Sequence, residues 1–270
     1  MRQRFKDQTV IVTGGGRGIG RETALAFAEE SAHVVLAGRR MDALDVSARE
    51  VRESGGTATV VQCDVAEDAD LAGLVQRALD ERGRIDVLVN NASALVGGAL
   101  CEANPDDLRR AAEVDVWAPM RLAQLVLPHM VVAKRGTIVN VSSLAGRLGV
   151  PYYAAFSGSK YAVRGFSEAL RRELTGTGVH VVCVFPGAVA DDMAENVEFD
   201  RFGLRCVTAP QVGRAIMRGV RLRTNEVFLG IGDAALAHWN DFLPGTIDAA
   251  AELLRRRFEA AADARRAALV

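Results

Sequence analysis

The residues with the clearest chemical role form a glycine-rich segment near the N-terminus. Residues 13–20 read Thr-Gly-Gly-Gly-Arg-Gly-Ile-Gly and lie between a predicted strand and a predicted helix. Glycines let the backbone come close to a pyrophosphate, and a helix N-terminus offers it free N–H groups and a positive dipole end. The spacing Thr-Gly-x-x-x-Gly-x-Gly differs from the Gly-x-Gly-x-x-Gly of many other dinucleotide sites. We therefore expect a nucleotide-binding loop, with contacts from Gly14, Gly16, Arg17, Gly18, Ile19 and Gly20.

This loop belongs to an alternating series of strands and helices. Apolar, β-branched runs predict strands over 9–12, 33–37, 57–61, 85–89, 137–141, 180–185 and 226–230, with helical patterns between them. Continuous apolar strands that alternate with helices indicate a parallel sheet covered on both faces. The sequence therefore predicts a single α/β domain over 1–270, a Rossmann-type doubly wound parallel sheet of about seven strands.

Short segments with polar, glycine or proline residues follow several of the predicted strands. They are Asp64-Val65, Asn90-Asn91-Ala92, Ser142-Ser143 and Pro186-Gly187, after the third to sixth strands. Open α/β sheets bind ligands at the carboxyl ends of their strands. We expect these segments, together with Val189, to complete the site that the glycine loop begins.

Taken in order across roughly residues 9–230, these segments resemble the short-chain dehydrogenase/reductase family. The resemblance implies an oxidoreductase with a nicotinamide cofactor, in which Asp64 holds the adenine amino group and Asn90 lines the pocket near the ribose. Ser93 departs from the family pattern Asn-Asn-Ala-Gly. The family also forms homodimers or homotetramers through helices that correspond to about 105–132 and 152–174 here.

The resemblance further implies a set of catalytic residues. Ser143 matches the serine that polarises the substrate carbonyl, and Lys160 matches the lysine that grips the nicotinamide ribose. Phe156 stands where the family has the tyrosine that relays a proton. Asp115 stands at the position of an asparagine whose main-chain carbonyl holds a water; Pro119, which has no N–H, leaves that carbonyl without its helical partner.

Phenylalanine has no titratable proton, so the route through the phenol is absent. A bound carbonyl could still accept hydride slowly with Ser143 or water assisting, because acid/base catalysis typically contributes about 10² to 10⁴ in rate. Tyr153 is a candidate either for a surrogate acid or for a wall of the substrate pocket. The Asp115 carboxylate has three interpretations: an ion pair with Lys160, a base of raised pKa, or a helix residue without chemistry.

Other positions bear on the choice of cofactor. The second strand ends in Arg39-Arg40 and not in the carboxylate that would bond an NAD ribose, and arginine forks pair well with a 2′-phosphate. NADP(H) is therefore favoured over NAD(H), although the arginines could also be surface residues on two turns. Asp191 stands where the family has a threonine near the nicotinamide; its charge would favour the oxidised ring, unless it faces water.

The overall composition excludes several other classes of protein. A net charge of -1 argues against a nucleic-acid surface, and four scattered histidines indicate no metal site. There is no apolar signal core and no run of about 18 apolar residues, so we expect a cytoplasmic protein without a transmembrane segment. The four cysteines lack a Cys-x-x-Cys pair, which fits reduced thiols.

The last third of the chain corresponds to the variable part of the family. A substrate lid is predicted at about 190–225 and a C-terminal helical extension at about 245–270. Five apolar residues predict an apolar lining for the lid and hence an apolar small-molecule substrate: Met193, Val197, Phe199, Phe202 and Leu204. The extension could pack on the domain, on a partner subunit or on a membrane surface.

Three functions are compatible with this sequence. The first is an NADP(H)-dependent oxidoreductase that acts on an apolar carbonyl or secondary alcohol. The second is a redox-silent protein that binds NADP(H) without turnover. The third is redox-neutral chemistry, such as dehydration, isomerisation or cyclisation, with Asp115 or Asp191 as base.

Overall fold

The computed structural model describes residues 3–190, 206–248 and 252. In these residues a parallel seven-stranded sheet has the order β3-β2-β1-β4-β5-β6-β9. Its strands are β1 (Thr9–Thr13), β2 (His33–Gly38), β3 (Thr57–Gln62), β4 (Val87–Asn90), β5 (Gly136–Val141), β6 (Val179–Phe185) and β9 (Glu226–Phe228). This confirms the predicted doubly wound α/β sheet.

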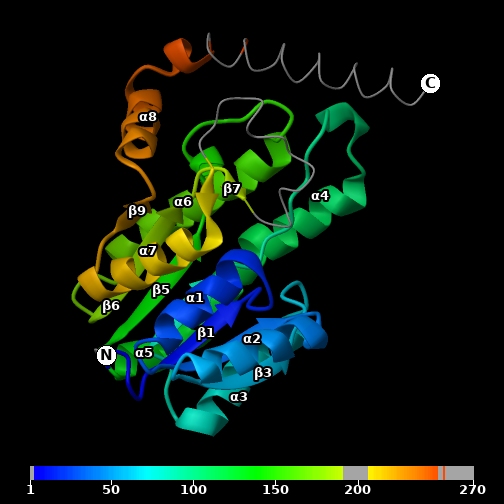
Figure 1. The fold of residues 1–270 in the computed structure, drawn as a ribbon. Helices are drawn as coiled ribbons and strands as arrows, with labels where there is room; N and C mark the ends of the chain where they lie inside the picture. The colour runs from blue at the N-terminus through cyan, green and yellow to red at the C-terminus, as the bar shows by residue number, and fades with distance from the viewer. Residues whose placement is uncertain (1–2, 191–205, 249–251, 253–270) are drawn as a thin grey trace.

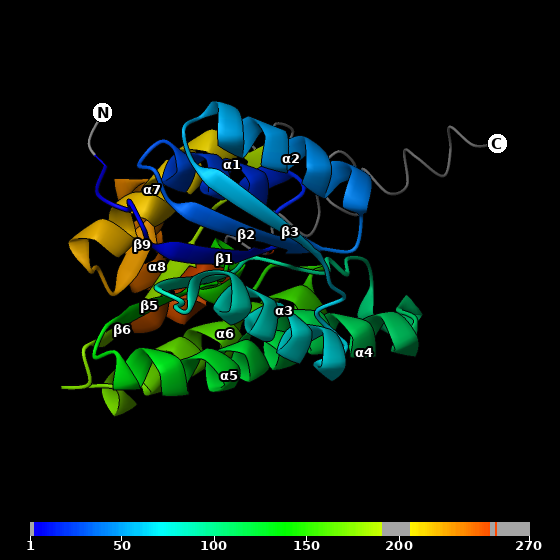
Figure 2. The same ribbon diagram turned by 90° about the horizontal axis from the view of Figure 1, so that it is seen from below.

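Helices cover both faces of the sheet, as Figures 1 and 2 show. One face carries α1 (Gly18–Ala28), α2 (Met41–Glu53) and α7 (Ala209–Leu222), and the other carries α3 (Asp68–Arg82), α5 (Ala118–Val132) and α6 (Ala154–Glu173). The central strands are buried on both sides, and Val10, Ile11 and Val12 of β1 are fully buried. This double burial explains why the strands are continuous apolar runs in the sequence.

The remaining elements lie around the carboxyl ends of the strands. They are η1 (Leu100–Glu102), α4 (Pro105–Ala112), η2 (Glu113–Trp117), η3 (Leu144–Gly146), α8 (Ile231–Phe242) and a small parallel pair, β7 (Val189–Ala190) with β8 (Val207–Thr208). In the described part of the chain, no helix combines the length and apolar character needed to cross a bilayer.

Helix α7 corrects part of the predicted lid. Its residues Val212 and Ile216 are fully buried, so the stretch from 209 to 222 belongs to the core. A Cβ at Gly213 would lie 2.6 Å from the backbone carbonyl of Glu22, so the glycine lets α7 cross α1 closely. The rest of the predicted lid, 191–205, lies outside the described residues, as does the predicted extension apart from 245–248 and 252.

Helix α4 begins as the sequence predicts, because the side chain of Asn104 accepts a hydrogen bond of 2.9 Å from the amide of Asp106. The expected irregularity before Pro119 takes the form of a π-helical turn, η2. There the amide of Ala118 donates to the carbonyl of Glu113, five residues back. Such turns occur often at functional sites, and this one contains Asp115.

The strand order reverses between β1 and β4: these two parallel strands are neighbours, with β2 and β3 added on one side and β5, β6 and β9 on the other. Thr13 joins the two strand ends: its hydroxyl accepts hydrogen bonds of 3.0 Å from the amides of Asn91 and Ala92. The side chain of Asn91 donates to the carbonyl of Thr13 over 2.9 Å. Ligands of open α/β sheets bind at such a switch point.

Candidate active site

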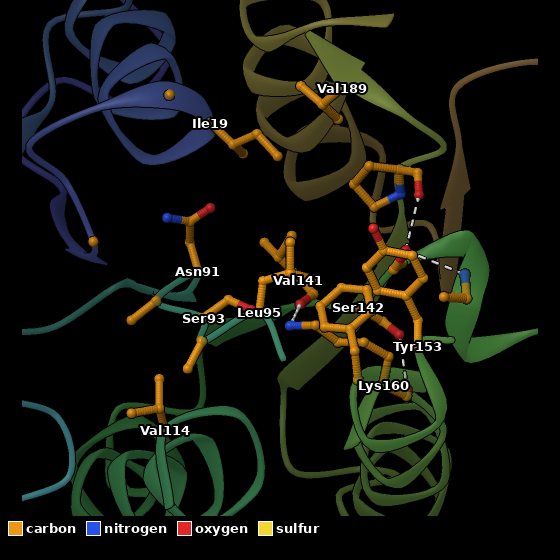
Figure 3. A pocket seen from close by; sticks show the side chains of 18 of the residues that line it. Ile19, Asn91, Ser93, Leu95, Val114, Val141, Ser142, Tyr153, Lys160 and Val189 are labelled. Carbon is orange, nitrogen blue, oxygen red and sulfur yellow. Dashed lines mark hydrogen bonds between the residues drawn. The ribbon is translucent and has the colours of Figure 1, made fainter. Parts of the chain in front are cut away.

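A cavity of about 640 Å³ opens at the carboxyl ends of the strands. Figure 3 shows it between the glycine loop side, with Ile19 and Asn91, and the α6 side, with Tyr153 and Lys160. Most of the predicted site residues line it: Gly14, Gly16, Arg17, Gly18, Ile19, Arg39, Arg40, Asp64, Val65, Asn91, Ala92, Ser143, Phe156, Lys160, Pro186, Gly187 and Val189. The structure therefore brings them into one continuous space.

The glycine loop has the backbone geometry of a phosphate cradle. Gly14 and Gly18 have φ angles of +67° and +51°, which side chains rarely allow. The residue before α1, Arg17, makes no side-chain cap to the helix, so the N-terminal amides of α1 are left without a side-chain acceptor beside the glycine loop. Gly20 does not line the cavity. A Cβ at this position would lie 2.2 Å from the Gly14 carbonyl oxygen, so the absence of a side chain at Gly20 lets the loop pack against α1.

Arginines gather where the resemblance places the adenosine end of the cofactor. Arg39 and Arg40 follow β2 directly and line the cavity with Arg17. Asp64 lines the same end and is ion-paired with Arg110 of α4. Burial opposes its ionisation, but the hydrogen bonds from Arg110 and the Ala66 amide hold the pKa of Asp64 below its ordinary value.

Asn90 does not lie where the resemblance places it. Its side chain is buried below the cavity and donates to Asn140 Oδ1 over 2.8 Å and to the Pro119 carbonyl over 3.4 Å. Asn140 in turn donates to the hydroxyl of Ser167 on α6 over 2.9 Å. These hydrogen bonds link β4 and β5 to α5 and α6 beneath the site. Asn90 is not among the residues that line the cavity.

Ser143 and Lys160 lie at the other end of the cavity. The Ser143 hydroxyl accepts from the Ala145 amide over 3.1 Å and donates to the Pro186 carbonyl over 3.5 Å. The Lys160 ammonium donates to the Val141 carbonyl over 3.4 Å. A hydroxyl donor and an ammonium group therefore share one wall.

Asp115 forms a buried ion pair with Lys160. The distance from Lys160 Nζ to Asp115 Oδ1 is 3.1 Å, and the two side chains are 4% and 0% exposed. The other carboxylate oxygen accepts a bond of 3.4 Å from the Ala94 amide. Asp115 lies behind Lys160 and is not among the cavity-lining residues. Of the three interpretations of this residue, the structure shows the ion pair.

The Phe156 ring lies beside this pair. Its centroid is 5.4 Å from Lys160 Nζ, a distance at which a ring face attracts a cation. The ring offers packing and no proton to the cavity. Phe156 therefore cannot serve as an acid or a base in this cavity.

Arg147 anchors the loop that carries Ser143. It is almost fully buried and forms ion pairs of 3.1 and 3.2 Å with Glu226 and Asp241. Its guanidinium also lies 5.3 Å from the centroid of the Phe185 ring. The Ser143 loop is thereby fastened to β9 and to α8.

Asp191 and the apolar lid residues lie outside the described residues, so their predicted roles stay predictions. Among the residues that are described, no group of three or more histidine, cysteine, aspartate or glutamate side chains could hold a metal ion. The cavity is also lined by Arg110 of α4, Leu236 of α8 and Ile247 after α8, none of which was assigned to the site from the sequence, although Ile247 lies on an apolar helical stripe of the predicted extension. Their contribution depends on long-range packing alone.

A family model described as "short chain dehydrogenase" matches residues 8–201. The chain belongs to the short-chain dehydrogenase family. A "ketoacyl reductase HetN" of Nostoc sp. is 34% identical over 224 residues, which cover 82% of this chain and 78% of that protein.

Other members of the short-chain dehydrogenase family agree with this assignment. The rat protein "dehydrogenase/reductase SDR family member 7B" is 32% identical over 71% of this chain, and the match spans 61% of the rat protein's own length. A crystal structure of a metagenomic short-chain oxidoreductase in complex with NADP has a TM-score of 0.73 and 30% identity, covering 83% of this chain and 97% of that one. The fold and the oxidoreductase class thus agree with the sequence-based resemblance.

Proposed function

We propose that this short-chain dehydrogenase transfers hydride between NADP(H) and an apolar carbonyl or secondary alcohol. The observation that carries the proposal is the continuity of the cavity. It joins the phosphate cradle at Gly14 to the hydroxyl of Ser143 and the ammonium of Lys160. A cofactor held along this length would have one end on the cradle and the other beside the polar pair.

The residues present fit NADP(H). The open glycine loop can accept a pyrophosphate, and Arg17, Arg39 and Arg40 offer guanidinium groups to a 2′-phosphate. The NADP in the metagenomic relative supports the same choice. When bound, the nicotinamide supplies or accepts the hydride, which is chemistry that no side chain provides.

The chain's own residues position and polarise the substrate in this proposal. The Ser143 hydroxyl, oriented by the Ala145 amide, can turn its proton from the Pro186 carbonyl to a substrate oxygen. Lys160 would hold the nicotinamide ribose, and Asp115 keeps its ammonium paired in a buried setting. Preorganised donors of this kind stabilise the negative charge that develops on a carbonyl oxygen.

Apolar side chains line the end of the cavity around Ser143 and α6. They include Leu95, Leu148, Val150, Pro151 and Leu236. This lining favours a hydrocarbon or aromatic substrate over a sugar or charged metabolite. The name of the Nostoc relative is consistent with a keto group on such a substrate.

The test is a panel of acetophenone, cyclohexanone and decanal, assayed with NADPH and with NADH by the loss of reduced-nicotinamide absorbance. We expect slow reduction with NADPH and less with NADH. Replacing both Arg39 and Arg40 by serine should weaken NADPH binding roughly ten- to hundredfold, because charge-assisted hydrogen bonds are lost. Arg49→Ser, an exposed arginine of the same helix region, is the control.

A second candidate is a redox-silent protein that binds NADP(H), and Phe156 favours it. NADPH binding without turnover of the panel, both in the wild type and in Phe156→Tyr, would select this function and overturn the first. Redox-neutral catalysis with Asp115 as base is not proposed, because its carboxylate is occupied by Lys160 and the Ala94 amide.

The assembly and location of the protein are part of the proposal. We expect a homodimer or homotetramer that uses the surface of α4, η2, α5 and α6, where Trp117 of η2 and Val132 of α5 are 51% and 85% exposed. Sedimentation analysis tests this directly. A reducing cytoplasm is the proposed location, because the four cysteines are free thiols.

A further inference from the structure

The proposed carbonyl reduction needs a proton for the substrate oxygen, and Phe156 cannot give one. Phenols are among the side chains that serve as general acids. Among the described residues that line the cavity, Tyr153 is the only phenol, and it lies three residues before Phe156 at the start of α6.

The turn that precedes α6 aims the Tyr153 side chain at the cavity. Tyr152 has a φ of +64°, a left-handed conformation that is unfavourable for an aromatic residue. Hydrogen bonds hold the turn on both sides: the Gly98 amide donates to the Tyr152 carbonyl and the Ser157 amide to the Tyr153 carbonyl, each over 2.7 Å. Backbone strain that is held in this way is typical of functional sites.

Gly97 fixes the ring from the opposite side. A Cβ at this position would lie 2.7 Å from Cε1 of Tyr153, so only a glycine lets the ring lie against this loop. The Tyr153 ring is thereby confined between the α6 turn and the segment after β4. A donor on a rigid support loses little entropy when it meets its acceptor.

Figure 3 shows the Tyr153 ring projecting into the cavity on the same side as Lys160 and Ser142. Ser142 is the neighbour of Ser143 and is bonded through its hydroxyl to the Lys160 carbonyl over 2.9 Å. We propose that Tyr153 is the catalytic acid of this protein and replaces the phenol that is missing at position 156. The proposal rests on the proposed carbonyl reduction.

In the reduction of a ketone, Tyr153 would supply the proton and NADPH the hydride. The π bond of the carbonyl breaks, its carbon gains the hydride that NADPH supplies, and its oxygen bonds the proton that leaves the Tyr153 hydroxyl. NADP⁺ and a secondary alcohol remain. Solvent water returns one proton to the phenolate, and the reverse sequence oxidises an alcohol.

The first test is Tyr153→Phe, which removes one hydroxyl and keeps the ring as a wall. The assay uses NADPH with acetophenone, or with whichever ketone of the panel the wild type reduces fastest. We expect kcat to fall about 10² fold or more. NADPH affinity, measured by fluorescence, should stay unchanged. Tyr161→Phe, an equivalent change on an exposed part of α6 outside the cavity, is the matched control and should keep wild-type kcat.

The second test moves the phenol. Adding Phe156→Tyr to Tyr153→Phe should restore reduction, because the double variant again has a phenol in the site, now at position 156. An unchanged kcat in Tyr153→Phe would overturn the proposal and leave the carbonyl reductase function standing. If the wild type reduces no panel compound while Phe156→Tyr does, Tyr153 does not act as the acid. If neither does, the proposed function itself fails.

A binding measurement tests the same hydroxyl without turnover. Benzamide has the shape of acetophenone and a carbonyl oxygen that accepts a hydrogen bond, but it is not reduced. Calorimetric titration in the presence of NADP⁺ should show about fivefold weaker benzamide binding to Tyr153→Phe than to the wild type, the value of one lost hydrogen bond. Equal affinities would mean that the hydroxyl does not reach the carbonyl.

Discussion

Replacing the buried Asp115 by asparagine should lower the free energy of unfolding far more than removing an exposed charge elsewhere on the protein would. The Lys160–Asp115 pair is 3.1 Å long, with side chains 4% and 0% exposed. At an effective dielectric constant of about 20, two unit charges at this distance attract by about 5 kcal/mol. Asparagine has nearly the same shape, so the variant keeps the packing and loses the compensating charge.

The expected loss in the free energy of unfolding is about 3 kcal/mol, because removing one partner leaves the other charge buried without compensation. Urea unfolding of the protein without cofactor measures it. Asp106→Asn is the control: its ion pair with Arg109 is 2.9 Å long but its side chain is 84% exposed, and the loss there should stay below about 1 kcal/mol.

A double-mutant cycle separates the ion pair from other effects of the substitution. Lys160→Met alone leaves the Asp115 charge buried, whereas Lys160→Met with Asp115→Asn removes both charges. The double variant should be more stable than the sum of the single losses predicts, by about 2 kcal/mol. Strictly additive losses would refute the reasoning, because they would show that the two side chains do not compensate each other.

Three further outcomes are expected. Arg147→Met should cost about 3–5 kcal/mol of unfolding free energy because two carboxylates lose a buried partner, whereas Arg172→Met, at an arginine whose side chain is 74% exposed, should cost less than about 1 kcal/mol. Burial, and then the neighbouring Arg82, lower the pKa of His33, so the unfolded chain binds a proton at this residue more readily than the folded protein does. The free energy of unfolding should therefore fall as pH drops from about 6.5 towards the lower pKa of the folded state. Urea midpoints measured across this pH range should show a smaller fall in His33→Asn. Burial raises the pKa of Cys183 to about 12, so iodoacetamide should label exposed Cys101 in the native protein and reach Cys183 only after unfolding, as peptide mass spectrometry would report.

The strands and the start of α4 could be predicted from the sequence because their signals are local. Strands that are buried on both faces leave apolar, β-branched runs, and Asn104-Pro105 begins a helix by its own chemistry. The strand predicted from 85 begins at Val87 instead. Just before this strand, the Asp86 carboxylate accepts a hydrogen bond of 2.9 Å from the Thr9 amide. A hydrophobicity pattern cannot predict this hydrogen bond.

The site could be predicted only in part, because its chemistry depends on contacts between distant residues. The sequence left three interpretations of Asp115, and 45 residues separate it from the lysine that decides between them. Arg110 has no local signal that it pairs with Asp64, 46 residues away. Asn90 has the expected strand-end position, but its side chain points into a polar network whose partners lie on other elements.

The order in which the cavity-lining residues occur along the chain has a consequence for protein synthesis. The cradle at Gly14 is translated first, whereas Leu236 and Ile247 close the cavity from near the other end of the chain. Chains emerge from the ribosome N-terminus first, at about 5–20 residues per second. A nascent chain that stops before α8 therefore carries the cradle without its far wall. Cofactor capture by ribosome-bound chains of increasing length would report when the last part of the wall has arrived.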